Sequence, residues 1–248
     1  MWGFFKAKDM GIDLGTANTL IYVKDTGIVL NEPSVIAVDA DSSKILAVGI
    51  EAKAMLGKSP RNISVIRPLQ DGVISDFDKT ADMLRTFIER AMGQKKMRNY
   101  RVAVGVPTGV TEVEKRAVEE VVRQMGATEV YILEEPMAAA IGAGLPVDGT
   151  TGCMIADIGG GTTDVAIIAL GGVVASTSIR HAGDKFNEAI IQYIRKRHAL
   201  LIGDRTAEEL KINIGCACMD EDEFGNEIIK TMNARGRDII SGCLLYTS

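Results

Sequence analysis

Three consecutive glycines interrupt an apolar, strand-like run in "IADIGGGTTDVAII", residues 155–168. Asp157 lies just before them and Thr162 just after. Glycine weakens a strand, but it also lets the backbone approach an anion closely and point its N–H groups at it. The segment therefore has two interpretations: a flexible hairpin turn, or a backbone loop that binds phosphate.

A second segment follows the same plan. In "GIDLGTANTLIYV", residues 11–23, Asp13 lies two residues before a Gly-Thr pair inside a strand–turn–strand pattern. Neither segment continues into the helix that a P-loop or a Rossmann turn requires. A carboxylate beside phosphate needs a cation between them, and Mg²⁺, bound largely through water, suits one or two carboxylates. The pair predicts two hairpins that hold one Mg–nucleotide, with Asp13 and Asp157 as the metal residues.

A third acidic position lies between a predicted strand, "EVYILEEP", and a predicted helix, "PMAAAIGAG". Glu135 falls at the junction, the edge at which α/β folds place their ligands. Pro136 suits the first turn of the helix. Two alternatives stay open: Glu135 stabilises the helix N-terminus, or Glu134 is the reactive carboxylate.

The elements that position these residues alternate in an α/β order. Apolar periodicity predicts a helix over residues 78–92, and Thr111 with Glu114 predicts a capped helix that stops before Gly126. After the Gly/Pro-rich segment 144–152 the hairpin pattern begins again at Cys153. This second occurrence indicates that the same glycine-containing hairpin is used twice, once in each half of the molecule.

Two further helices are predicted near the end of the chain. The first, over residues 184–197, has an acidic start, a basic end and an apolar face made of Phe186, Ala189, Ile190, Tyr193 and Ile194. The second begins with an expected capping box from Thr206 to Glu209. Beyond Cys216 the pattern decays, and the final "GCLLYTS" completes no predicted strand or helix, which indicates truncation.

Composition narrows the class of protein. The 248 residues are 46% hydrophobic and 25% charged, as in a soluble globular protein of one or two domains. The net charge of −5, without a long basic run, argues against a nucleic-acid partner. The four cysteines show neither a disulfide framework nor zinc spacing. Trp2, Phe4 and Phe5 beside two lysines have two interpretations, a membrane-surface anchor or aromatic side chains packed on the domain.

Together, these motifs resemble those of the actin, sugar-kinase and heat-shock-chaperone ATPase superfamily. Within it, "IDLGTANTLIYV", "NEPSVIAV", "IRPLQDGVISDF" and "EEPMAAAIGAGLPV" are similar to the MreB family of bacterial actin-like rod-shape proteins. The resemblance covers about residues 10–215 and fades by about residue 240. It implies an α/β, actin-like (ribonuclease H-like) duplicated fold with two halves around a nucleotide cleft. The implied halves are residues 1–144, with a small inserted subdomain at about 37–69, and residues 145–248, incomplete, with a small subdomain from about 185.

The resemblance also implies roles for individual residues. Glu135 would orient or deprotonate the water that attacks the γ-phosphate. The implied nucleotide-binding set comprises Asp13, Gly15, Thr16, Ala17, Asn18, Asp157, Gly159, Gly160, Gly161, Thr162, Glu208, Glu209, Leu210 and Lys211. By spacing alone, Glu208 and Lys211 are explained equally well as a surface ion pair on one helix face.

The implied function is ATP-dependent assembly, with Mg²⁺ and weak ATP hydrolysis, into filaments of the protein itself. Such filaments lie on the inner face of the cytoplasmic membrane, work with cell-wall synthesis proteins and maintain rod shape. Two alternatives stay open: a monomeric kinase or chaperone ATPase on the same fold, and a truncated fragment without activity.

Overall fold

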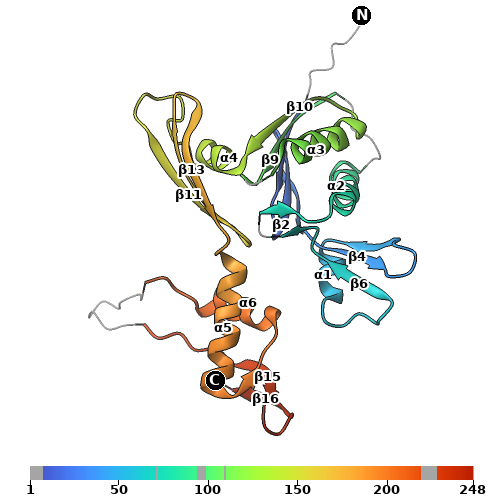
Figure 1. The fold of residues 1–248 in the computed structure, drawn as a ribbon, viewed down its shortest axis with the longest axis vertical. Helices are drawn as coiled ribbons and strands as arrows, with labels where there is room; N and C mark the ends of the chain where they lie inside the picture. Colours follow the sequence, from blue (N-terminus) through green and yellow to red (C-terminus); the bar gives the residue numbers. More distant parts are fainter. Residues whose placement is uncertain (1–7, 71, 94–98, 109, 219–227, 248) are drawn as a thin grey trace, which may run out of the picture. The chain divides into compact units, whose positions relative to one another are not determined.

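The structure is a computed structural model that describes residues 8–70, 72–93, 99–108, 110–218 and 228–247. Trp2, Phe4 and Phe5, the predicted membrane contacts, lie outside these residues. The chain divides into two compact units, residues 1–180 and 181–248 (Figure 1). This division by contacts is distinct from the predicted boundary between two halves at residue 144, which stays a prediction.

The centre of the first unit is a five-stranded sheet that contains the first predicted hairpin. Its order is β10 (Ala127–Glu134), β9 (Tyr100–Val106), β1 (Lys8–Leu14), β2 (Asn18–Val23) and β3 (Gly27–Pro33). β1 is parallel to β9 and β9 to β10, whereas β1, β2 and β3 form an antiparallel meander. The carboxyl ends of β1, β9 and β10 therefore meet at one edge of the sheet.

Alternate side chains of this sheet pack against α2 (Phe77–Met92) and α3 (Glu112–Gln124), which lie together on one side of it (Figure 1). Phe87 of α2 is fully buried in this core, as its apolar spacing predicts. The predicted capping box of α3 is confirmed, with the Thr111 side chain accepting from the N–H of Glu114. Asp76 caps α2 in the same way through the N–H of Lys79.

Two small sheets extend from this core. The first has the order β5 (Ile45–Val48), β4 (Ile36–Asp39) and β6 (Ile63–Ile66), and packs with α1 (Ile50–Met55). The second is a short hairpin of β7 (Leu69–Gln70) and β8 (Val73–Ile74). Sequence patterns did not predict α1, β6 or this hairpin.

The second predicted hairpin lies in a separate antiparallel sheet of β11 (Cys153–Ile158), β12 (Thr163–Ala169) and β13 (Gly172–Ile179). One face contacts α4 (Glu135–Gly142) through a small cluster that includes Ala140 and Ile168. Every residue of β13 is exposed. This sheet therefore has much less packed interior than the five-stranded one.

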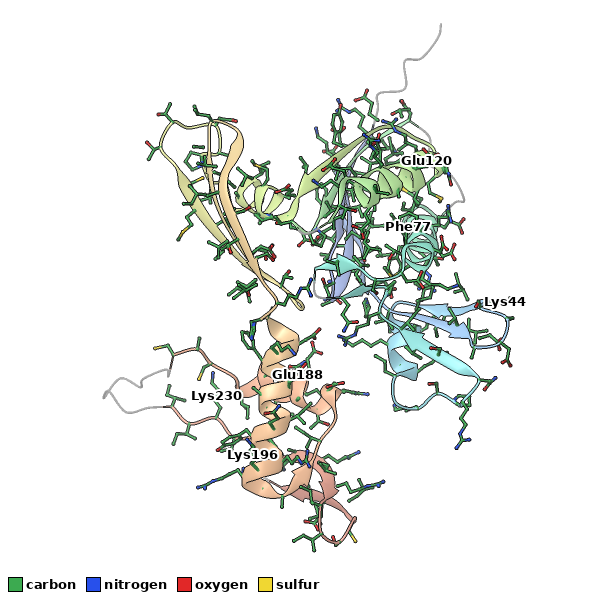
Figure 2. The ribbon with its side chains drawn as sticks, in the orientation of Figure 1. Lys44, Phe77, Glu120, Glu188, Lys196 and Lys230 are labelled. Atoms are coloured by element: carbon green, nitrogen blue, oxygen red, sulfur yellow. The ribbon has the colours of Figure 1, made fainter. Side chains whose placement is uncertain are left out.

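The second unit packs α5 (Gly183–His198) and α6 (Asp204–Ile214) against β14 (Leu200–Leu201), β15 (Ala234–Asp238) and β16 (Leu244–Thr247). Asp184 in the first turn and the basic last turn of α5 are as predicted. Glu188 and Lys196 extend outward from the helix (Figure 2).

Three predictions for this unit are wrong. The "GCLLYTS" segment does complete a strand, because β16 pairs with β15. The predicted apolar face of α5 is displaced, because α6 and the small sheet cover only one side of the helix. Phe186, Ala189 and Tyr193 are exposed, and the covered side instead carries Asn187, Ile190, Ile191 and Ile194.

The capping box at Thr206 is the third error, because α6 begins at Asp204, after Gly203, with no side-chain cap. Thr206 consequently lies inside the helix. Glu209 pairs with Arg205 one turn earlier, at 2.9 Å between its Oε1 and the arginine Nε. Among the described helices, none has both the length and the hydrophobicity needed to cross a bilayer.

Candidate functional site

The two glycine-containing turns have the hairpin form that the sequence predicts. In the first, β1 and β2 pair directly from Leu14 with Thr19 back to Met10 with Val23. In the second, Ile158 pairs with Thr163 and Asp157 with Asp164, and the Gly159 N–H donates to the Thr162 carbonyl at 2.9 Å. Both turns thus leave the backbone of their tips outside the strand ladders.

The tips of the two hairpins touch each other. A Cβ added at Gly160 would lie 2.6 Å from the Cβ of Ala17, so only glycine allows this approach. A Cβ at Gly15 would lie 2.7 Å from the Asn18 carbonyl oxygen, within its own turn. The two segments that were matched by sequence are therefore brought together in space.

Ser34, which sequence reasoning did not single out, holds the first turn from behind. Its hydroxyl donates to the Gly15 carbonyl at 2.6 Å, and its N–H donates to the Ala17 carbonyl at 3.0 Å. A 2.9 Å hydrogen bond joins its hydroxyl to that of Thr19, and both side chains are fully buried. The quoted "NEPS" run contains this serine, but nothing in its local pattern shows that it returns to the first hairpin.

A cavity of about 440 Å³ opens beside the hairpins. Asp13, Glu135 and Asp157 line it together with apolar and small side chains from β1, β2, β9, β10 and α4. The three candidate carboxylates, which are far apart in sequence, thus share one site. The arrangement follows from topology, because β1 and β10 end at the same edge and α4 contacts the β11–β12 hairpin.

Asp164 is a fourth carboxylate at this site. It is 3% exposed and pairs across β11–β12 with Asp157, so both side chains lie on the same face of the sheet. The antiparallel register of "DIGGGTTD" is the sequence signal that could have identified it. Among the described residues, none of these four carboxylates forms a salt bridge.

The pKa values of Asp13, Asp157 and Glu135 are raised. Desolvation, and then the charge of Asp157, raises the pKa of Asp13, which remains partly open to solvent. Desolvation, and then the charge of Asp164, raises the pKa of Asp157. Burial first, and then the charges of Asp13, Asp164 and Asp157, raises the pKa of Glu135 to about 8.

Glu135 is the better candidate of the two adjacent glutamates. Its Oε1 is buried and has no hydrogen-bond partner. Glu134 instead lies 3.6 Å from the Lys115 ammonium, which also pairs with Glu112. A buried polar oxygen without a partner is costly, so the Glu135 carboxyl is suited to bind water or a ligand group.

The chemistry of these donors fits Mg²⁺ only in its water-bound form. The described residues contain no group of three or more acidic, histidine or cysteine side chains close enough to hold a metal directly. Mg²⁺ is normally held by one or two carboxylates together with phosphate oxygens and water. Asp13 and Asp157, which line the cavity beside the two turns, are the residues that would hold a hydrated cation of this kind.

The predicted nucleoside segment, Glu208 to Lys211, lies on α6 in the second unit. Glu208 and Lys211 do not form the surface ion pair considered as an alternative. The Lys211 ammonium instead donates to the Gly183 carbonyl in the first turn of α5, at 3.1 Å. Leu210 is buried between the helices, so it supports the segment through packing. The nucleoside contact itself stays a prediction.

The fold and the paired turns define this chain as an actin-like α/β protein, as the sequence predicts. The model of the MreB/Mbl protein family matches residues 7–246, and the chain belongs to that family. The match continues to residue 246, past the point near residue 240 by which the resemblance was expected to have faded.

The relatives are cell-shape proteins by name. Cell shape-determining protein MreB of Escherichia coli K12 is 52% identical over 241 residues, which are 95% of this chain and 68% of the relative. Cell shape-determining protein Mbl of Bacillus subtilis is 49% identical over 236 residues, covering 95% of this chain and 69% of Mbl. The crystal structure of MreB5 of Spiroplasma citri bound to AMPPNP is 40% identical, with a TM-score of 0.83, covering 97% of this chain and 71% of MreB5.

Proposed function

We propose that this chain binds ATP with Mg²⁺ between its two glycine turns and assembles into filaments that maintain rod shape. The observation that carries the proposal is the contact of Gly160 with Ala17 beside four unpaired carboxylates. The N–H groups of the two tips and the hydroxyls of Thr16 and Thr162 are the donors for phosphate oxygens. Asp13 and Asp157 would hold the hydrated Mg²⁺, which would neutralise phosphate charge.

The nucleoside end of ATP is assigned to Glu208, Glu209, Leu210 and Lys211 on α6. The Lys211 ammonium donates to the Gly183 carbonyl and so links this segment to the first turn of α5. MreB5 of Spiroplasma citri, which has been crystallised with AMPPNP and with ADP, supports nucleotide binding in the family. The proposed site would have to distinguish an ATP analogue such as AMPPNP from ADP, because assembly is proposed to depend on which of the two states is bound.

Glu135 is the residue we assign to weak ATP hydrolysis. Its buried Oε1 accepts a hydrogen bond from water, orients that water toward the γ-phosphate and receives its proton. A carboxyl with a pKa of about 8 is largely protonated at neutral pH. A Mg²⁺ ion held by Asp13 and Asp157 would neutralise two of the charges that raise the pKa of Glu135, and so would favour its basic form.

We also propose that the filaments assemble at the inner face of the cytoplasmic membrane and contact cell-wall synthesis proteins; the family and its cell-shape relatives support a role in cell shape. ATP would favour assembly, and hydrolysis through Glu135 would weaken the polymer. Trp2, Phe4 and Phe5 are the proposed membrane contacts. A monomeric ATPase of the same fold is the competing function.

Two measurements separate these possibilities. Titration with fluorescent AMPPNP, with Mg²⁺ and again with EDTA, is expected to show binding that depends on Mg²⁺; no binding in either condition would overturn the nucleotide site. Sedimentation after adding ATP is expected to pellet the protein above a critical concentration. Protein that binds nucleotide yet stays in the supernatant at every concentration and salt tested would be the monomeric ATPase.

A further inference from the structure

The tip of the β7–β8 hairpin contacts the second glycine turn. A Cβ added at Gly72 would lie 2.5 Å from the Cγ2 methyl of Thr162 and 3.5 Å from its Oγ1. Gly72 has φ +73°, a conformation that glycine adopts without strain. The contact joins residues 90 positions apart and places no side chain between the hairpin backbone and the threonine. Gly72 thus allows a backbone to pack directly on a residue of the proposed phosphate site.

The hairpin that carries Gly72 is firmly anchored. Leu69 is fully buried in the main core, and its strand partner Ile74 is 9% exposed. At the base, the Pro68 carbonyl accepts from the Ser75 N–H at 2.9 Å, the Ser75 hydroxyl at 3.0 Å and the Thr80 hydroxyl at 3.4 Å. These contacts hold the base of the hairpin against the main core.

Thr162 is sensitive to such a surface. Its side chain is 7% exposed, and a β-branched residue has few accessible χ1 rotamers. The Cγ2 methyl lies 2.5 Å, and the hydroxyl 3.5 Å, from the position that a Cβ would take at Gly72, so the methyl is the group nearer to that position. The Thr162 carbonyl is held at the same time by the Gly159 N–H. Backbone and side chain of this residue are therefore both constrained.

We propose that Gly72 is a positioning residue, which holds the Thr162 hydroxyl in the orientation that binds the phosphate end of the nucleotide. This inference rests on the proposed nucleotide function and adds a residue that neither glycine turn contains. It places Gly72 next to the glycine turn between β11 and β12. It also predicts that phosphate binding is coupled to a hairpin that never touches the ligand.

The experiment is a double-mutant cycle on the affinity for Mg–AMPPNP. Gly72→Ala adds a methyl that collides with the Thr162 methyl, and is expected to weaken binding about tenfold, within the range for residues in contact. Thr162→Ser keeps the hydroxyl but removes the methyl, so it loses the fixed rotamer and weakens binding by a smaller factor, about threefold. In Gly72→Ala/Thr162→Ser the collision is gone, and the double variant is expected to bind more tightly than Gly72→Ala alone.

Gly57→Ala is the matched control for backbone strain. Gly57 has φ +70°, and a Cβ there has no neighbour within 4 Å. Alanine strains the backbone to a similar extent at Gly57 and at Gly72, because both glycines have positive φ. Since the methyl at residue 57 meets no neighbour, Gly57→Ala is expected to bind Mg–AMPPNP within about twofold of wild type. Thermal unfolding of every variant reports folding separately from binding.

Failure of the nucleotide function and failure of the positioning role of Gly72 give different results in this experiment. If wild type fails to bind Mg–AMPPNP, the nucleotide function and this inference both fall. If wild type binds and Gly72→Ala matches Gly57→Ala, or if the losses in the double variant simply add, only the positioning role is wrong. Should Gly72→Ala not fold, Thr162→Ser decides alone: binding and hydrolysis equal to wild type would show that the methyl contact positions nothing.

Discussion

The two glycine hairpins have the same turn chemistry but very different structural support. The β1–β2 hairpin lies inside a five-stranded sheet, with β9 and β3 paired on its two sides and its inward side chains in the main core. The β11–β12 hairpin has one exposed strand beside it and a cluster centred on Ala140 and Ile168. The short turn motif therefore specifies what a loop can bind, and the packing around it determines how firmly the loop is held.

The largest expected effect concerns the carboxylate that belongs to neither hairpin. Glu135→Gln removes the base but keeps the size and the hydrogen-bond acceptor, so ATP hydrolysis is expected to fall about 10²- to 10⁴-fold while AMPPNP affinity changes little. Single-turnover hydrolysis measures the chemical step. Glu134→Gln is the control, because Glu134 is paired with Lys115. Equal losses in the two variants would contradict the assignment.

The next largest effect tests directly how much the packed core beneath each hairpin contributes to stability. Ile21 and Ile168 are both fully buried, one beneath each hairpin. Ile21→Ala is expected to lower the free energy of unfolding by about 2–5 kcal/mol, and Ile168→Ala by less, because the smaller cluster collapses more easily around the gap. Urea denaturation measures both. Ile28→Ala is the exposed control. A larger loss for Ile168→Ala would reverse the comparison.

The two hairpins can also be compared by their contribution to Mg²⁺-dependent nucleotide binding, because each carries one of the proposed metal residues. Asp13→Ala and Asp157→Ala are each expected to weaken Mg–AMPPNP binding about 10- to 100-fold, and to have little effect on the residual binding in EDTA. Asp9→Ala is the matched control, since Asp9 lies four residues earlier on β1 and pairs with Arg101. Unchanged affinity for Asp157→Ala would rule out the model of two aspartates and one magnesium ion.

The shared carboxylates also predict a pH dependence for the protein without nucleotide or Mg²⁺. Glu135 has its pKa raised from 4.5 to about 8, so between these values the folded state holds a proton that the unfolded state has lost. The free energy of unfolding should therefore fall as the pH rises from 5 to 8, by about 1–2 kcal/mol after solvent screening. Urea denaturation in EDTA across this range measures it. Glu135→Gln should remove most of this change in the free energy of unfolding with pH. An unchanged pH dependence in the variant would mean that another group causes it.

The sequence was sufficient for the parts of the fold and site that depend on local chemistry. Apolar periodicity predicted α2, and the turn glycines predicted both hairpins, because each signal lies within one short segment. The junction at Glu135 followed from a strand end beside a helix-starting proline. These patterns need no knowledge of what lies across the sheet.

The missed features depend on long-range contacts. Ser34 reaches the first turn only because β3 folds back beside β2, and Gly72 reaches Thr162 across 90 residues. The apolar face of α5 was displaced because the neighbours of a helix, and not its own sequence, decide which side is covered. The strands β15 and β16 were missed because Ala234–Asp238 carries two arginines and little apolar alternation.

The smallest expected effect compares the two Thr-x-x-Glu patterns, which look alike in sequence. Thr111 is the cap of α3 and exchanges hydrogen bonds with Glu114, whereas Thr206 lies inside α6 and Glu209 pairs with Arg205. Thr111→Ala is expected to lower the free energy of unfolding by about 1 kcal/mol, and Thr206→Ala by less than about 0.5 kcal/mol. Paired urea denaturation curves measure the difference. Equal losses would mean that α6 begins at Thr206 in solution, and that its capping pattern acts as the sequence predicts.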